Sequence, residues 1–227
     1  MPAAGAAGPE FATISWKGEG EVRMYIVFLA GGIASGKSSV ASALERLGCV
    51  RIDLDRVSRE VLEPGSPCLD ALAEAFGADI VDPKTGMLDR PLLAERAFST
   101  EGNRRLLEDI ELPFIKAGLS EHLAELADEP GMAVVEIPLL DRLDDLSAAD
   151  EVVYVHVPRP IRRERAIARG MSGDDFDARD AAQPSEEYLF AHADTVLDNG
   201  GTPQELEQAL AAWIGQRGRF MDAGGED

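Results

Sequence analysis

The chain has 227 residues, of which 45% are hydrophobic, and its formal net charge is −20 at pH 7. This acidic balance excludes a protein that works through a broad basic face, so we do not expect a nucleic-acid-binding protein. The sequence has no secretory signal and no apolar run of about 18 residues, the length a membrane-spanning helix needs, so we expect a cytoplasmic protein without membrane contact.

The two ends of the chain show no sustained hydrophobic period. Residues 1–23 are rich in Ala, Gly and Pro before they turn polar, and residues 219–227 have the same loose composition, so we interpret both as flexible tails. The only cysteines of the sequence, Cys49 and Cys68, lack metal-ligand spacing. Two such cysteines are typical of reduced thiols in a cytoplasmic protein.

Five short apolar runs predict the strands of a buried parallel sheet. They are MYIVFLA (24–30), CVRID (49–53), MAVVEI (132–137), EVVYVHV (151–157) and ADTVLDN (193–199). Helical patterns lie between them, one ending at Gly48 and two opening at Pro160 and Pro203, where proline suits the first turn. This alternation predicts a three-layer α/β fold with helices on both faces of the sheet.

Two mostly helical segments interrupt the alternation. Residues 63–127 are too long for a loop, so we expect an inserted helical domain with a turn at DPKTGMLD (82–89). A second helical segment, residues 160–190, follows the fourth strand. The core is then expected to comprise residues 24–62, 128–159 and 191–218.

The stretch GGIASGKS, residues 31–38, fits the pattern G-x-x-x-x-G-K-[ST] between a predicted strand and a predicted helix. Its glycines let successive backbone N–H groups point into one concavity, and the helix start adds further N–H groups. Lys37 would reach the β- and γ-phosphates, and the Ser38 hydroxyl would ligate Mg²⁺. We expect ATP to be bound by Gly31, Gly32, Ile33, Ala34, Ser35, Gly36, Lys37, Ser38 and Ser39, and Mg²⁺ by Ser38.

Acidic residues follow two of the predicted strands, at the sheet edge where open α/β folds bind ligands. Asp53 can accept the proton of an attacking hydroxyl or cap the next helix, and we favour catalysis for Asp53 and capping for Asp55. Glu136 is either an acid near the metal or a solvent-side acid, and the sequence favours neither.

Five arginines cluster at the start of the second helical segment: Arg159, Arg162, Arg163, Arg165 and Arg169. On a helix, Arg162, Arg165 and Arg169 share one face. Guanidinium groups bind phosphate oxygens in two-point contacts, so we expect at least one of these three to hold a phosphate. The segment would then act as a lid that excludes water; the alternative is a solvated helix face.

The histidines and large aromatic residues carry little functional signal. No serine, cysteine or second histidine frames His122, His156 or His192, so we interpret all three as structural. Phe190 and Trp213 are interpreted as core residues.

Seven stretches in order resemble the dephospho-coenzyme A kinase family over about residues 25–216: GGIASGKS, IDLDRVSREVLEPGSP, FGADIVDPKTGMLDRPLLAERAF, IPLL, the Arg165–Arg169 pair, RDAAQ and ADTVLDNGG. The resemblance implies a P-loop kinase with a five-stranded parallel sheet, a helical substrate domain and a helical lid. It also implies transfer of the ATP γ-phosphoryl group to the ribose 3′-hydroxyl of dephospho-coenzyme A, the last step of coenzyme A synthesis.

The resemblance also implies residue roles by matched position. Asp53 would be the catalytic base, and Arg165 and Arg169 would be the lid arginines. Asn199 matches a motif near the nucleotide base, and Lys37, from the G-x-x-x-x-G-K-[ST] pattern, would join Asp53 and the lid arginines in catalysis. The residues implied on the substrate side are Asp53, Arg59, Gly65 and Arg90.

One departure keeps other functions open. The family usually carries a His-Pro pair where this chain has Leu112-Pro113, so a P-loop kinase for a different small hydroxyl acceptor is an alternative. A non-catalytic ATP-binding regulator is another. In each case we expect small-molecule partners, with no nucleic acid and no membrane, and a monomer or weak homo-oligomer.

Overall fold

The structure, a computed structural model, describes residues 23–143 and 145–222, with side chains up to Arg217. The two predicted tails, residues 1–23 and 219–227, fall largely outside these ranges. In the part of the chain that is described, no helix is both long and apolar enough to cross a membrane.

The chain divides into two compact units. Unit 1 comprises Met1–Arg51, Asp128–Leu140 and Leu146–Asp227, and unit 2 comprises Ile52–Ala127 and Asp141–Asp145. This division places residues 52–62 with the helical insertion, whereas the sequence placed them with the core.

All five predicted strands are confirmed, with ends shifted by at most two residues. They are β1 (Met24–Ala30), β2 (Val50–Asp53), β3 (Gly131–Glu136), β4 (Glu151–His156) and β5 (Thr195–Asp198). They form one sheet in the order β2-β3-β1-β4-β5, with β1–β3, β1–β4 and β4–β5 paired in parallel. Leu29 of β1 lies opposite Glu136 of β3, so the end of β3 reaches the level at which β1 ends. This confirms the predicted α/β fold with a parallel sheet.

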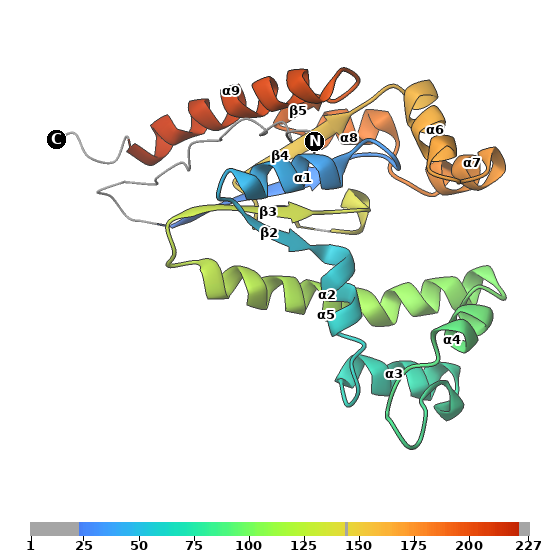
Figure 1. Cartoon of the computed structure of the whole chain (residues 1–227). Coiled ribbons are helices and arrows are strands. Elements are labelled where there is room, and N and C mark those ends of the chain that lie inside the picture. The colour runs from blue at the N-terminus through green and yellow to red at the C-terminus, as the bar shows by residue number, and fades with distance from the viewer. Residues whose placement is uncertain (1–22, 144, 223–227) are drawn as a thin grey trace, which may run out of the picture. The chain divides into compact units, whose positions relative to one another are not determined.

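The described helices of unit 1 are α1 (Lys37–Arg46), α6 (Arg159–Ala168), α7 (Gly173–Ala181), α8 (Glu186–His192) and α9 (Pro203–Asp222). Figure 1 shows α1 and α9 along one face of the sheet. Alternate strand residues, such as Val27 and Leu29, bury their side chains against Val40 and Leu44 of α1. Burying each side chain of this size stabilises the fold by ~1.5–3 kcal/mol. The core on this face thus holds α1 against the strands.

Local sequence signals set the ends of the helices between β4 and β5. Pro160 lies in the first turn of α6, as predicted, and the helix begins one residue earlier, at Arg159. The Ser172 hydroxyl accepts a hydrogen bond from Asp175 N at the start of α7, and Ser185 caps α8 in the same way. Such caps satisfy backbone N–H groups that the first helical turn leaves without partners.

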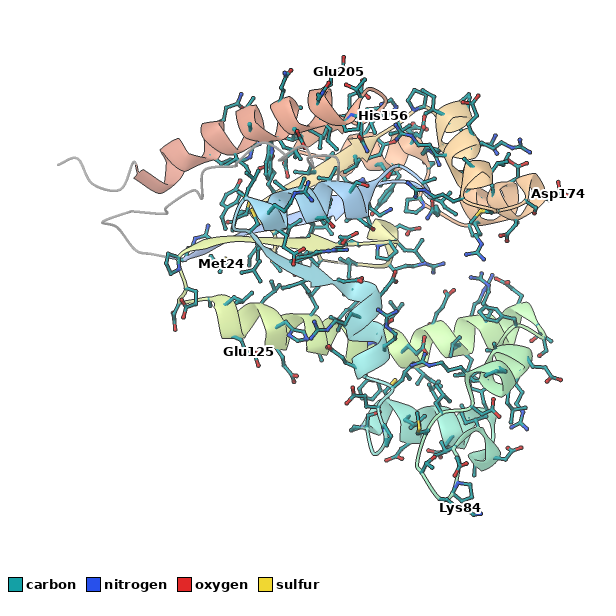
Figure 2. All side chains as sticks on the ribbon, viewed as in Figure 1. Met24, Lys84, Glu125, His156, Asp174 and Glu205 are labelled. Carbon is teal, nitrogen blue, oxygen red and sulfur yellow. The ribbon has the colours of Figure 1, made fainter. Side chains whose placement is uncertain are left out.

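Unit 2 is helical and has a core of its own. Its helices are α2 (Leu54–Glu60), α3 (Pro67–Phe76), the short 3₁₀ turn η1 (Ala78–Ile80), α4 (Arg90–Ala97) and α5 (Glu101–Leu126), and a second 3₁₀ turn, η2 (Leu140–Arg142), lies at its boundary. Leu72, Phe76 and Ile80 are buried in its core. The predicted turn at residues 82–89 is confirmed: Asp82 Oδ1 accepts from Lys84 N at 2.7 Å, and Figure 2 shows Lys84 at its tip.

Candidate active site

The loop between β1 and α1, residues 31–36, joins the central strand to the helix that packs on it. Gly36, the N-cap of α1, has φ 89° and ψ 24°, the left-handed conformation that favours glycine. A Cβ at Gly36 would overlap the side-chain amide of Asn199. A Cβ at Gly32 would lie 2.6 Å from Nη1 of Arg162. The backbone conformation favours glycine at Gly36, and a side chain at either position would displace a side chain from a distant segment.

The Lys37 ammonium lies over the loop from which its helix starts. Nζ donates to Gly31 O at 2.5 Å and, more weakly, to Gly32 O at 3.4 Å. The structure thus places the predicted phosphate-binding cation beside the backbone of the glycine stretch. Its contact with a nucleotide stays a prediction.

Ser38, Glu136 and Arg51 form a hydrogen-bonded chain in unit 1. The Ser38 hydroxyl donates to Glu136 Oε2 at 2.9 Å, and Arg51 Nε donates to Glu136 Oε1 at 2.6 Å. Glu136 is only 6% exposed, so its interpretation as a solvent-side acid is wrong. A carboxylate buried this deeply requires a counter-charge, and Arg51 supplies it.

The oxygen groups around the loop fit a magnesium–nucleotide complex. Ser38 and Glu136 present the hydroxyl and carboxylate oxygens that Mg²⁺ prefers. Ser35 Oγ, within the loop, is buried and has no hydrogen-bond partner among the described residues, which leaves a polar atom for a ligand to satisfy. Among the described residues, no group of three or more His, Cys, Asp or Glu is arranged so that it could hold a metal ion. A divalent ion here would be held by Ser38 together with phosphate oxygens and water, as Mg²⁺ commonly is.

Asn199 fixes the loop from the far end of the sheet. Its Nδ2 donates to Ser35 O at 2.8 Å, and both groups are buried. Asn199 follows β5, so this contact couples the loop to the edge strand. The resemblance placed Asn199 near the nucleotide base. This contact with the loop does not test that placement, which stays a prediction.

The segment predicted to be a lid contacts the loop at Ile33. Ile33 N donates to Gln183 Oε1 at 2.5 Å, and Arg162 Nη1 lies 3.4 Å from Ile33 O. Arg162 is 5% exposed and is paired with Asp180 Oδ1 at 2.5 Å. Of the three arginines predicted on one helix face, Arg162 is therefore a buried group that positions the loop. Sequence reasoning missed Gln183, although it ends the stretch RDAAQ that carries the resemblance.

Comparison with known proteins identifies the family. The sequence model of the dephospho-CoA kinase family matches residues 25–205. The chain belongs to the dephospho-CoA kinase family. Its relatives include the dephospho-CoA kinases of Anaeromyxobacter dehalogenans, 39% identical over 87% of this chain and 96% of the relative, and of Leifsonia xyli, 37% identical over 86% of this chain and the relative's full length.

Two solved structures share the fold of this chain. TT1252 from Thermus thermophilus is 32% identical, with a TM-score of 0.71, over 85% of this chain and 97% of that protein. The dephospho-CoA kinase from Campylobacter jejuni, at 23% identity, shares the fold with a TM-score of 0.67 over 86% of this chain and 97% of its own. The predicted recognition and fold class are thus confirmed.

Arg165 and Arg169, the lid arginines implied by the dephospho-CoA kinase resemblance, differ from their neighbours in their contacts. Arg159 is paired with Asp177 at 2.6 Å, and Arg163 with the same carboxylate at 3.4 Å. In the described part of the chain, the guanidinium groups of Arg165 and Arg169 make no hydrogen bond or ion pair. These two arginines are therefore free of protein carboxylates, which suits a role toward an anionic ligand.

Asp53 caps α2. Its Oδ1 accepts from Asp55 N at 2.9 Å, so the capping role we favoured for Asp55 belongs to Asp53, and Asp55 lies in the first helical turn. Among the described residues, Asp53 Oδ2 has no hydrogen-bond donor. One carboxylate oxygen thus serves the fold, and the other is left for chemistry. Catalysis by Asp53 stays a prediction for this member of the dephospho-CoA kinase family.

The predicted substrate residues all lie in unit 2. Arg59 is exposed in the last turn of α2, and Arg90 is exposed at the start of α4. Gly65 has φ 82°, and a Cβ there would meet nothing within 4 Å, so backbone conformation rather than space favours glycine. Burial raises the pKa of Glu111, and the Arg90 charge partly offsets that rise. Leu112, next to Glu111 in α5, is half-buried at the family's usual histidine position.

The aromatic predictions are confirmed in part. Trp213 is buried, but Phe190 is 46% exposed, so its interpretation as a core residue is wrong. Its ring lies edge-to-face on Tyr154, at 5.1 Å between centroids, and 5.4 Å from the ring of His156, which Figure 2 labels. Of the histidines interpreted as structural, His122 hydrogen-bonds Glu60 at 2.9 Å, a contact between α5 and α2.

Proposed function

We propose that this chain transfers the γ-phosphoryl group of ATP to the ribose 3′-hydroxyl of dephospho-CoA and releases CoA and ADP. The observation that carries the proposal is the phosphate loop at residues 31–38, in which Ser38 is hydrogen-bonded to the buried Glu136. The loop geometry supports nucleotide binding. Membership of the dephospho-CoA kinase family supports the acceptor.

The backbone of the loop binds the phosphates. The N–H groups at the start of α1, added to the positive end of the helix dipole, stabilise negative charge on the β- and γ-phosphate oxygens. Lys37 moves from the Gly31 carbonyl to those oxygens as a point charge. Mg²⁺, when bound through Ser38, neutralises charge on the same oxygens.

Asp53 acts on the acceptor. The 3′-hydroxyl oxygen attacks the γ-phosphorus, its proton passes to Asp53 Oδ2, and the bond between the γ-phosphorus and the β–γ bridging oxygen breaks to release ADP. Because Oδ1 remains hydrogen-bonded to Asp55 N, the carboxylate keeps its orientation during the transfer. The base can be weak, since catalysis of phosphoryl transfer is mostly positioning and charge stabilisation.

Arg165 and Arg169 stabilise the charge on the transferring group. Their guanidinium groups face no partner carboxylate among the described residues, so binding phosphate does not require breaking an ion pair. The lid also reaches the loop through Gln183 and Arg162, both in contact with Ile33. Closure over the nucleotide would exclude water, which otherwise competes as acceptor.

The test is a panel of acceptors. Purified protein is given ATP and Mg²⁺ with dephospho-CoA, with a 3′-deoxy analogue, and with nucleosides, nucleotides and small alcohols, and ADP release is measured. Lys37→Ala is the inactive control, because it removes contacts to both the bound nucleotide and the transition state. We expect ADP release with dephospho-CoA and with no other acceptor of the panel. Turnover with another acceptor and none with dephospho-CoA would replace the proposal.

Leu112 favours one alternative, a kinase of the same chemistry with a different small hydroxyl acceptor. The same panel decides between the two. A regulator that holds ATP without transfer would show binding but no turnover with any acceptor. A cytoplasmic location and a monomeric or weakly associating state remain predictions from the sequence.

A further inference from the structure

Arg51, on β2, is placed to control the carboxylate that holds Ser38. Its Nε donates to Glu136 Oε1 at 2.6 Å, and its Nη2 lies 2.5 Å from the same oxygen. Its Nη1 donates to Ser42 Oγ, on α1, at 3.2 Å. The Arg51 side chain is 26% exposed and that of Glu136 is 8% exposed. The guanidinium thus binds both the acid and the helix that carries Ser38.

The direction of the Ser38 hydrogen decides whether its oxygen can bind a cation. A serine hydroxyl has one hydrogen and two lone pairs, and a cation binds a lone pair. The hydrogen bond to Glu136 Oε2, at 2.9 Å, fixes that hydrogen on the side of β3. The lone pairs of Ser38 Oγ then point away from Glu136. A carboxylate rotated out of this position would leave the hydroxyl free to turn.

We propose that Arg51 is a positioning residue of the magnesium–nucleotide site. By holding Glu136 Oε1, it keeps Oε2 where it accepts the Ser38 hydrogen, and so keeps the Ser38 oxygen turned toward the cation. The proposal rests on the nucleotide binding of the proposed function and is independent of the acceptor. Groups that orient a metal ligand in this way typically change metal affinity about 10–100-fold when they are removed.

A purely structural role for Arg51 makes a different prediction. If Arg51 only balanced a buried charge, its loss would lower the unfolding temperature and leave the effect of Mg²⁺ on nucleotide binding unchanged. The deciding quantity is therefore the ratio of ATP affinity with Mg²⁺ to ATP affinity in EDTA. This ratio is measured by titration calorimetry without any acceptor.

The first experiment compares the wild type with Arg51→Met and with Arg46→Met. Arg46, in the last turn of α1, is exposed and makes no side-chain hydrogen bond or ion pair among the described residues, so it controls for loss of one positive charge in the same unit. Arg51→Met is expected to lower the Mg²⁺-dependent gain in affinity about 10-fold and to leave the affinity in EDTA within about twofold. Arg46→Met is expected to change neither. An unchanged gain in Arg51→Met overturns the proposal.

The second experiment tests whether Arg51 acts through Glu136. Arg51→Met is made in the background of Glu136→Gln, and the Mg²⁺-dependent gain is measured for the single and double variants. Two residues that act through one contact are non-additive, so the double variant is expected to match Glu136→Gln. Additive losses overturn the proposal. If Arg51→Met does not fold, Arg51→Lys serves in both comparisons, because it keeps the charge and loses the two-point geometry.

The outcomes separate this inference from the proposed function. If the wild type does not turn over dephospho-CoA, but the Arg51 variant shows a reduced Mg²⁺-dependent gain in ATP affinity, dephospho-CoA is rejected as the acceptor and the role of Arg51 is kept. Normal turnover with an unchanged gain would reject the inference and keep the acceptor.

Discussion

The side-chain amide of Asn199 donates a hydrogen bond of 2.8 Å to the backbone carbonyl of Ser35, across 164 positions of sequence. Asn199 follows the edge strand β5, and Ser35 lies in the phosphate loop next to the central strand. Because Asn199 Nδ2 also occupies the space that a Cβ at Gly36 would need, the two residues constrain the loop together. The curvature of the loop is therefore held from outside the motif that defines it.

We predict that Asn199→Ala weakens ATP binding by about 10-fold, since an unpaired buried carbonyl costs ~1–3 kcal/mol and lets the loop relax. Asn199→Asp should weaken it further, because a carboxylate cannot donate to Ser35 O and places negative charge beside the loop. Titration calorimetry with ATP measures both. Gln208→Ala, at an exposed position of α9, is the control. Equal ATP affinity in all three variants would show that the loop holds its shape without Asn199.

Asp53 has a capping role and a proposed catalytic role, and two substitutions separate them. Asparagine is as good an N-cap as aspartate, so Asp53→Asn is expected to keep the unfolding free energy and ATP affinity while lowering kcat ~10²–10⁴-fold. Asp53→Ala should lower kcat similarly and also destabilise the protein by ~0.5–2 kcal/mol. Asp55→Asn is the matched control. A normal kcat in Asp53→Asn would show that Asp53 only caps α2 and does not act in catalysis.

The lid arginines are predicted to divide into structural and functional residues. Arg162→Met removes the buried partner of Asp180, which keeps its ion pair with Arg159, and should lower the unfolding free energy by ~1–3 kcal/mol, measured by urea denaturation. Arg165→Met and Arg169→Met should change the unfolding free energy by less than ~0.5 kcal/mol. Each should lower kcat/KM ~10²–10³-fold, as loss of a transition-state charge contact does. Loss of stability without loss of turnover in the Arg165 and Arg169 variants would contradict this division.

Glu151 makes stability depend on pH. Burial alone would raise its pKa, but hydrogen bonds from Arg217, Thr195 and Trp213 outweigh burial, and the pKa lies below the ordinary value of 4.5. A group with a lowered pKa in the folded state stabilises the fold above its unfolded pKa, and that contribution is lost as the pH falls through the folded pKa. The wild type should therefore lose stability on acidification below about pH 4.5 through this group.

In Arg217→Met we expect the pH dependence of the unfolding free energy to reverse its direction. With the guanidinium removed, burial dominates and the pKa of Glu151 rises, so stability falls as the pH rises through the new folded pKa. We expect the variant to be ~3 kcal/mol less stable than the wild type near neutral pH, and the difference to shrink toward pH ~4.5. Urea unfolding across this range measures both proteins. A difference that stays constant with pH would show that Glu151 is not the group responsible.

Local patterns in the sequence predicted what depends on neighbouring residues. The loop GGIASGKS is a contiguous stretch whose glycines, lysine and serine act through adjacent backbone atoms, so its place between β1 and α1 followed from the residues alone. Apolar runs marked all five strands, and proline marked the first turn of α6. These signals work because strand and helix periods, turns and caps are set within a few residues.

The tertiary structure decided which distant side chains meet. The sequence left two interpretations of Glu136 open. The sheet order places β3 between β1 and β2, and Glu136 hydrogen-bonds Ser38, 98 positions away, and Arg51, 85 positions away. Arg162 carried the same sequence signal as Arg165, and burial against Asp180 alone distinguished it. Sequence separation carries no information on such pairs, because the partner of a side chain depends on which strands and helices lie next to it in space.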